Sequence, residues 1–325
     1  MKSSHLSNVF LGVFLLIAIT AGLSACQKPD DALHYGGQLY ADELLLQGID
    51  FWAAHGCNVE HVLYKNPDDL MTAFQSGVAD VVLLSDIQAA QIFTSMGDEA
   101  LIIGVTESGN RVSTIVRRDS GIESWADLAG KKVALRSGSG AELALKHYFS
   151  LHEYLDWDAV EWFNLPVEDM PAALANGSVD AISATEPIPA MAQAAGGMQV
   201  MQSYGDCCPS PLLLVTTRDY ARQHSQLLTA FLQGQLDKAT LIQSDPALAA
   251  RTASAQAVVY GLEVSPAAYH IVFKRVNFAM QFSEDLLSAL ESTAAQLVDA
   301  GVLEKVPDFQ ADPQYLEAAM AKNTQ

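Results

Sequence analysis

The chain has 325 residues, half of them hydrophobic and 17% charged, so it can bury a core large enough for two domains or one two-lobed unit. Acidic residues outnumber basic ones by 38 to 18, and the formal net charge is -20. Because nucleic-acid binding depends on a basic face, this charge excludes that class of partner. The same negative field repels anionic ligands at long range, so any anion site must be built locally.

The first 25 residues have the order of a bacterial signal peptide. A basic start precedes the apolar run 9–19, and small residues follow it. The run is short for a membrane-spanning helix. Residues 23–26 read Leu-Ser-Ala-Cys, which resembles a bacterial lipobox with Cys26 as the acylated residue. We therefore predict a signal peptide over 1–25, lipid attachment at Cys26, a polar tether over 26–32, and a location at the bacterial cell envelope, exported and lipid-anchored.

From residue 33 onward, short apolar strands alternate with helices. The expected strands are 33–39, 59–64, 78–84, 101–105, 113–117, 132–135, 160–165 and 179–184. The expected helices are 41–54, a short one from Asp69, 87–95, 125–129, 141–153, a short one from Asp169, and 189–195. This alternation predicts an α/β fold with two lobes, each a mostly parallel sheet flanked by helices. After residue 220 the pattern is helical and includes an amphipathic stretch over 283–300, which predicts a helical C-terminal tail.

Residues 69–86 and 169–186 are two copies of one unit. In each copy a short helix begins near an Asp, ends at a Gly suited to a left-handed backbone, and is followed by an apolar strand. The strand then meets a polar pair that can open the next helix, Ser85-Asp86 in the first copy and Thr185-Glu186 in the second. The repeat predicts that these two pairs occupy equivalent positions in the two lobes.

Several stretches resemble a known family of binding proteins. They are 116–122 (VRRDSGI), 125–134 (WADLAGKKVA), 176–181 (NGSVDA), 186–187 (EP) and 301–307 (GVLEKVP). These stretches are similar to periplasmic substrate-binding proteins of ABC importers for nitrate, sulfonate, taurine and thiamine-precursor pyrimidines. The resemblance implies the type II periplasmic-binding-protein fold, with a hinged cleft that closes on a small-molecule ligand. It also implies an ABC permease and its ATPase as partners.

On this resemblance, the first lobe begins with residues 33–115, the second lobe spans 116–205, and 206–325 returns to complete the first lobe. The chain is expected to cross between the lobes near 113–118 and again near 204–215.

Ligand contacts are expected beyond the carboxyl ends of the strands, where helix N-termini point. Ser137, Gly138 and Ser139 follow the strand 132–135 and open a helix. Their amides and hydroxyls can hold an anionic or carbonyl oxygen, and the alternative is an ordinary capping turn. The turn lacks the Gly-Lys-Ser/Thr ending of a phosphate-binding loop.

The repeat supplies further candidates for ligand contact. Ser85-Asp86 and Thr185-Glu186 would face each other across one cleft when the lobes close, or would only cap helices.

Gln38 and Tyr40 lie at the end of the first strand, where a Tyr can stack on a ligand, hydrogen-bond it, or simply pack.

Three cysteines remain after Cys26. In an exported protein, Cys57, Cys207 and Cys208 could form a 57–207, 57–208 or vicinal 207–208 disulfide, or stay free. The spacing of Cys57 with His55 and His61 is not a recognised zinc pattern, so we predict no metal and no cofactor.

These features predict a solute-binding lipoprotein rather than an enzyme, since the chain has no nucleophile elbow, triad signature or cofactor loop. The alternatives are an enzyme on the same scaffold, similar to the pyrimidine synthases, and a solute sensor for a membrane kinase. The ligand stays open at this point. The Ser-Gly turn favours a sulfonate or nitrate, whereas the net charge and two cleft carboxylates favour a neutral or amine-bearing molecule such as a pyrimidine.

Overall fold

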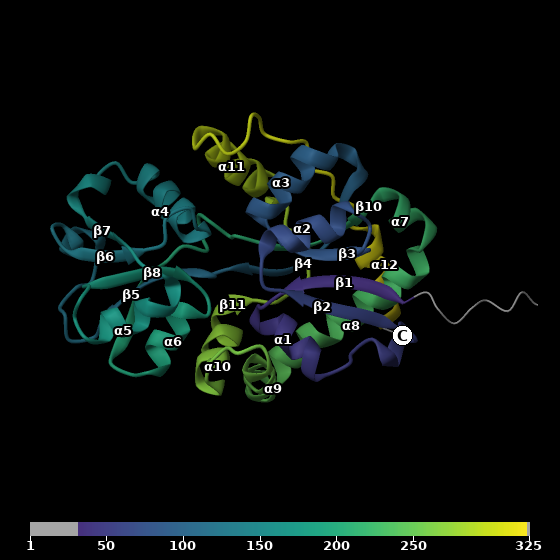
Figure 1. Cartoon of the computed structure of the whole chain (residues 1–325), viewed down its shortest axis with the longest axis horizontal. Helices are drawn as coiled ribbons and strands as arrows, with labels where there is room; N and C mark the ends of the chain where they lie inside the picture. The colour runs from purple at the N-terminus through teal and green to yellow at the C-terminus, as the bar shows by residue number, and fades with distance from the viewer. Residues whose placement is uncertain (1–31, 324–325) are drawn as a thin grey trace, which may run out of the picture. The chain divides into compact units, whose positions relative to one another are not determined.

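The computed structural model describes residues 32–323, and within them the chain forms two lobes, each built on its own sheet (Figure 1). Lobe 1 comprises residues 32–109 and 212–323, and lobe 2 comprises residues 112–203. The predicted signal peptide and Cys26 lie outside the described residues. No helix among those described combines the length and apolar character needed to cross a membrane.

The sheet of lobe 1 has the strand order β11-β4-β10-β3-β1-β2. Its strands are β1 (Leu33–Gln38), β2 (Val59–Tyr64), β3 (Val81–Ser85), β4 (Ala100–Gly109), β10 (Leu212–Thr217) and β11 (Val276–Asn277). Strands β1, β2 and β3 run parallel, whereas β10 pairs antiparallel with both β3 and β4.

The sheet of lobe 2 has the order β7-β6-β8-β5-β9. Its strands are β5 (Val112–Arg117), β6 (Lys132–Leu135), β7 (Glu161–Asn164), β8 (Ala181–Thr185) and β9 (Met198–Ser203). Strand β6 is parallel to β7 and β8, and β5 is antiparallel to β8 and β9. The predicted α/β class is confirmed. Both sheets are mixed, because β10 and β5, the first strand after each crossing, run against the βα units.

Helices cover both faces of each sheet (Figure 1). The α-helices are α1 (Ala41–Gly48), α2 (Pro67–Gln75), α3 (Asp86–Met96), α4 (Gly140–Ser150), α5 (Met170–Ala175), α6 (Ile188–Ala194), α7 (Arg218–Gln223), α8 (Ser225–Ser244), α9 (Pro246–Val259), α10 (Pro266–Arg275), α11 (Leu286–Asp299) and α12 (Gln314–Asn323). Short 3₁₀ turns cover Ala53–His55, Gly97–Glu99, Trp125–Leu128, Trp157–Ala159 and Val167–Asp169. The helix predicted over 41–54 therefore ends at Gly48, and the one predicted over 125–129 is a 3₁₀ turn.

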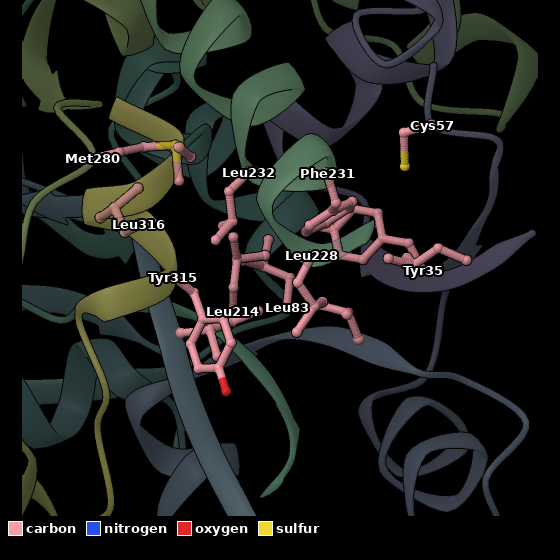
Figure 2. Packing of buried hydrophobic residues seen from close by; sticks show 14 of the residues in the cluster. Tyr35, Cys57, Leu83, Leu214, Leu228, Phe231, Leu232, Met280, Tyr315 and Leu316 are labelled. Atoms are coloured by element: carbon pink, nitrogen blue, oxygen red, sulfur yellow. The ribbon is translucent and has the colours of Figure 1, made fainter. Parts of the chain in front are cut away.

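Strand β3 is held rigidly because both of its faces are buried. Val81 and Leu83 pack into the cluster that α8 and α12 cover, shown in Figure 2, while Val82 and Leu84 pack toward α2, α3 and α11. Alternating burial of this kind fixes the strand's register, since a one-residue slip would exchange the two faces. The residues that follow β3 are consequently placed at a defined position at the junction of the lobes.

Two segments, 110–111 and 204–211, join the lobes. The first crossing comes earlier than the predicted boundary at 115, because β5 pairs with β8 from Val112 onward and so belongs wholly to lobe 2. The crossings touch at Gly205, where a Cβ atom would lie 2.6 Å from the backbone carbon of Gly109. Only glycine permits this close approach.

Candidate ligand-binding site

A small cavity lies between the lobes, beside the second crossing. It is lined by α3 and α11 of lobe 1, α4 of lobe 2, and residues 207–211 of the crossing. Its volume of about 40 Å³ leaves room for about three water molecules. A drug-sized solute needs a pocket of roughly 300 Å³ or more, so entry of such a solute requires the lobes to separate.

Asp86, which follows β3, lines this cavity. Its carboxylate accepts hydrogen bonds from the Ile87 amide and the Thr293 hydroxyl, both at 3.0 Å. Burial raises the pKa of Asp86, and its hydrogen bond from Thr293 and the nearby Arg111 oppose that rise. Ser85, in contrast, forms a capping box with Gln88 at the start of α3.

Glu186, the counterpart of Asp86 in the repeat, is buried in an ion pair between the lobes. Its carboxylate bonds to the guanidinium of Arg275, at the end of α10 in lobe 1, and accepts the Ala190 amide at 3.1 Å. Arg275 also donates to Gln193 of lobe 2. Burial raises the pKa of Glu186, and Arg275 opposes that rise. Glu186 therefore ties the lobes together, while Asp86 faces the cavity. Thr185 stands in the β8 register opposite Val112.

Arg111, on the first crossing, lies at the centre of the junction, a role that the sequence pattern did not predict. Its Nε lies 2.9 Å from Glu107, and its Nη1 donates to the Ser210 carbonyl at 2.9 Å on the other crossing. The guanidinium stands over the ring of Tyr40, 5.2 Å from the centroid, and the Tyr40 hydroxyl donates to Gln38 at 3.2 Å. Gln38 and Tyr40 are thus at the junction, with the ring packed on a cation. The sequence signal that could have indicated this role is the position of Arg111 between two apolar strand segments.

Beneath Arg111 lies a buried network of carboxyl groups. Lys238 bonds to Asp42 at 2.6 Å and lies 3.8 Å from Glu43, which also accepts the Tyr35 hydroxyl at 2.8 Å. Burial and the neighbouring Asp42 hold the pKa of Glu107 well above its usual range. Burial also acts to raise the pKa of Asp42, but the Lys238 ammonium and the hydrogen bond from Glu107 bring it below its usual value. The opposite directions of these two shifts favour a protonated Glu107 beside an ionised Asp42.

The predicted Ser-Gly turn is a helix cap in this structure. The Ser137 amide donates to the Asn164 side chain at 3.0 Å, and the Gly138 amide donates to the Glu142 carboxylate at 2.6 Å. Ser139 caps α4 by accepting the Glu142 amide. A carboxylate of the protein already occupies the place where a bound oxyanion would sit. Of this segment, the residue that lines the cavity is Gly140 rather than Ser137, Gly138 or Ser139.

The three cysteines of the described chain are free thiols. Cys57 lies in the core of lobe 1, whereas Cys207 and Cys208 pack against the core of lobe 2. The 57–207 and 57–208 bridges are therefore wrong, because their partners belong to separate cores. The sulfurs of Cys207 and Cys208 are 3.2 Å apart, and both residues line the interlobe cavity. Within residues 32–323, no cluster of three or more His, Cys, Asp and Glu side chains could hold a metal ion.

The profile of the NMT1/THI5-like family matches residues 45–249 of this chain. The chain belongs to the NMT1/THI5-like family. This confirms, at the level of family and fold, the resemblance inferred from the sequence. No curated protein sequence matched the chain.

Solved structures share the fold of this NMT1/THI5-like protein. The aliphatic sulphonate-binding protein SsuA of Escherichia coli matches with a TM-score of 0.71 at 19% identity, covering 89% of this chain and 91% of that one. SsuA of Xanthomonas axonopodis pv. citri, bound to MOPS, matches with a TM-score of 0.63 at 20% identity, covering 85% and 95%. The desulfurization enzyme DszB matches with a TM-score of 0.66 at 18% identity, covering 90% and 99%. Binding proteins and an enzyme share this fold, so function must be argued from the site.

Proposed function

We propose that this protein is the solute-binding component of an ABC importer, exported and held at the membrane by a lipid on Cys26. The observation that carries the proposal is the interlobe cavity, which residues of both lobes and the second crossing line around the half-buried carboxylate of Asp86. A ligand that contacts both lobes binds the closed form best and shifts the population toward it. The permease and its ATPase would then recognise the closed, loaded form.

The charges at the junction favour a ligand with an amine or another nitrogen donor over an oxyanion. The basic groups described there already contact acidic side chains: Arg111 Nε lies 2.9 Å from Glu107, and Arg275 and Lys238 form ion pairs with Glu186 and Asp42. Asp86, in contrast, bonds to a backbone amide and a hydroxyl, both neutral donors. A buried carboxylate is costly without an opposite charge or strong donors, and a ligand N–H group would offset that cost.

DszB makes an enzyme on the same scaffold the competing interpretation, and Cys207, Cys208 and His147 do line the cavity. However, the Cys207 thiol contacts the Tyr204 carbonyl and the Cys208 sulfur. A nucleophilic cysteine needs a base that takes its proton. These contacts favour a role for Cys207 in the wall of the binding cavity rather than as the nucleophile of a catalytic dyad.

A ligand screen tests the proposal. The mature chain carrying Cys26→Ser is heated with matched solutes: aminopyrimidines and primary amines on one side, alkanesulfonates and nitrate on the other. We expect an amine-bearing solute to raise the unfolding temperature, since ligand at about 100 times its Kd adds about 2.7 kcal/mol of stability. Stabilisation by sulfonates or nitrate alone would overturn the ligand class. Conversion of the bound solute, followed by NMR, would overturn the transport role.

A further inference from the structure

Cys207 and Cys208 form a compact turn on the second crossing. Both backbone amides donate to the Tyr204 carbonyl, at 3.2 and 2.7 Å, and this holds the two residues in one tight loop. The sulfurs contact each other at 3.2 Å, and both side chains line the interlobe cavity and are half-buried. Two adjacent thiols thus already face each other in a cavity that a reagent can enter when the lobes separate.

This turn is joined to the parts that must move when the lobes open. The carbonyl of Pro209 accepts the Gly109 amide at 2.8 Å, and the carbonyl of Ser210 accepts Arg111 at 2.9 Å, so the turn is tied to the first crossing. The Cys208 thiol also donates to the Ala144 carbonyl on α4 of lobe 2, at 3.4 Å. A chemical change at the sulfurs therefore acts on a contact between the second crossing and lobe 2.

We propose that Cys207 and Cys208 form a reversible vicinal disulfide in the wall of the interlobe cavity, and that its formation loosens the closed arrangement of the lobes. The inference rests on the proposed export of the protein, because an oxidising compartment supplies the disulfide oxidant. Ring closure removes the Cys208 S–H donor from the Ala144 carbonyl and draws the sulfurs to a bonding distance of about 2.0 Å. The turn then loses a direct tie to lobe 2.

The reaction is thiol–disulfide exchange with a small disulfide R–S–S–R. The Cys207 thiolate attacks one sulfur of the reagent, forms a mixed disulfide and expels one R–S⁻. The Cys208 thiolate then attacks the Cys207 sulfur and expels the second R–S⁻. Two thiol protons leave to solvent or to the released thiolates, and the two electrons lost by the cysteines reduce the reagent to two R–SH.

The order of attack follows from the environment of each thiol. The contact with Cys208 lowers the pKa of Cys207, whereas the same contact and burial raise the pKa of Cys208. Cys207 is therefore the first nucleophile. Burial in the core of lobe 1 raises the pKa of Cys57 to about 11, so that thiol serves as an unreactive internal reference.

Mass spectrometry after treatment with oxidised glutathione tests ring closure. The mature chain with Cys26→Ser is expected to lose the mass of two hydrogen atoms, to regain it with a reducing dithiol, and to keep one alkylatable thiol at Cys57. Cys207→Ser and Cys208→Ser, two conservative variants at half-buried positions, should each fail to show this loss. A glutathione adduct that persists on the wild-type chain, a bridge to Cys57, or a disulfide-linked dimer would each overturn the proposal.

Small-angle X-ray scattering tests the coupling to closure. We expect a larger radius of gyration for the oxidised than for the reduced protein, and no change when the Cys207→Ser/Cys208→Ser double variant meets the same oxidant. Identical scattering from the two wild-type states would overturn the coupling. No readout here uses a ligand, so failure of this inference leaves the solute-binding proposal standing, and a failed ligand screen leaves the disulfide untouched.

Discussion

Arg111 shows how single residues at the lobe junction combine charge pairing with geometry. One guanidinium contacts Glu107, the ring of Tyr40 and the carbonyl of Ser210, and so joins both crossings to the end of β1. Buried ion pairs are weak evidence for stability, because desolvation consumes much of the Coulomb gain. Ion pairs do determine which side chains contact each other. Glu186 and Asp42 are engaged in such pairs, and Asp86 is the carboxylate that lines the cavity.

The raised pKa of Glu107 has a measurable consequence for stability. The raised pKa of Glu107, caused by burial and by Asp42, means that its favourable contribution is fully present below the ordinary Glu pKa of about 4.3 and is lost as pH rises through the folded-state pKa. Glu107→Gln mimics the protonated form. We expect the unfolding temperature of this variant, relative to wild type, to be similar near pH 4 and to become higher as pH increases.

Glu304→Gln, an exposed position, is the matched control and should track wild type at every pH. Thermal unfolding followed by circular dichroism across this pH range provides the measurement. A Glu107→Gln variant that instead becomes less stable relative to wild type as pH increases would show that Glu107 is ionised in the native state and paired with Arg111.

Asp86→Asn removes the cavity's charge with little change of shape. If the ligand carries an amine, the variant should bind it at least about tenfold more weakly, since charge-assisted hydrogen bonds contribute about 1.5–3 kcal/mol and 1.4 kcal/mol is tenfold in affinity. Wild-type affinity should also fall at acid pH, earlier than for an ordinary Asp, because burial raises the pKa of Asp86. Calorimetry with the solute found by screening measures both effects. Asp68→Asn, at an exposed position, is the matched control. If Asp86→Asn binds the solute as tightly as wild type, Asp86 does not contact the ligand.

At the scale of elements, the repeat predicts the frame of the site but not the roles within it. Strands β3 and β8 are followed by Asp86 and Glu186, as the duplicated pattern indicates. The two acids differ because Arg275 pairs with Glu186 from 89 residues away along the chain. Periodicity and capping patterns report on neighbours in sequence, so a partner at that separation leaves no local signal.

Strand β9 illustrates a second limit of the sequence pattern. Met198–Ser203 is an edge strand, buried at its first residue and half-buried along the rest, so it lacks the alternation that marks a strand with one buried face. Strands β2 and β6, in contrast, have the predicted bounds of 59–64 and 132–135. Helix ends were less predictable, because α1 stops at Gly48 although apolar residues continue to Ala54.

The C-terminal end of α10 provides a test of the interlobe contact. Arg275→Ala removes the partner of the buried Glu186 carboxylate, and a buried charge without its partner disfavours the closed form. We expect a more open protein in small-angle scattering and about tenfold weaker binding of the screened solute, because closure must then be driven without this ion pair. The neighbouring Lys274→Ala, at an exposed position, should leave both quantities unchanged. Equal scattering from the two variants would mean that the pair does not hold the lobes closed.

At the scale of the whole molecule, folding and anchoring are assigned to different parts of the chain. Residues 32–323 belong to one compact unit, with β1 beginning at Leu33. The predicted lipid attachment site at Cys26 precedes this unit. The net charge of -20 opposes nonspecific contact with anionic membranes, so a covalent lipid is the attachment that the sequence offers.

Cys26→Ser is therefore expected to separate location from folding. The variant should incorporate no labelled fatty acid and should move from the membrane to the soluble fraction, because one thiol carries the anchor and more than one acyl chain is needed for stable attachment. Its unfolding temperature should match that of the wild-type protein, since no residue of the compact unit changes. Ser24→Ala keeps a small residue in the cleavage zone and should remain lipidated and membrane-bound. A Cys26→Ser protein that still carries label, or stays with the membrane after a high-salt wash, would place the anchor elsewhere in the chain.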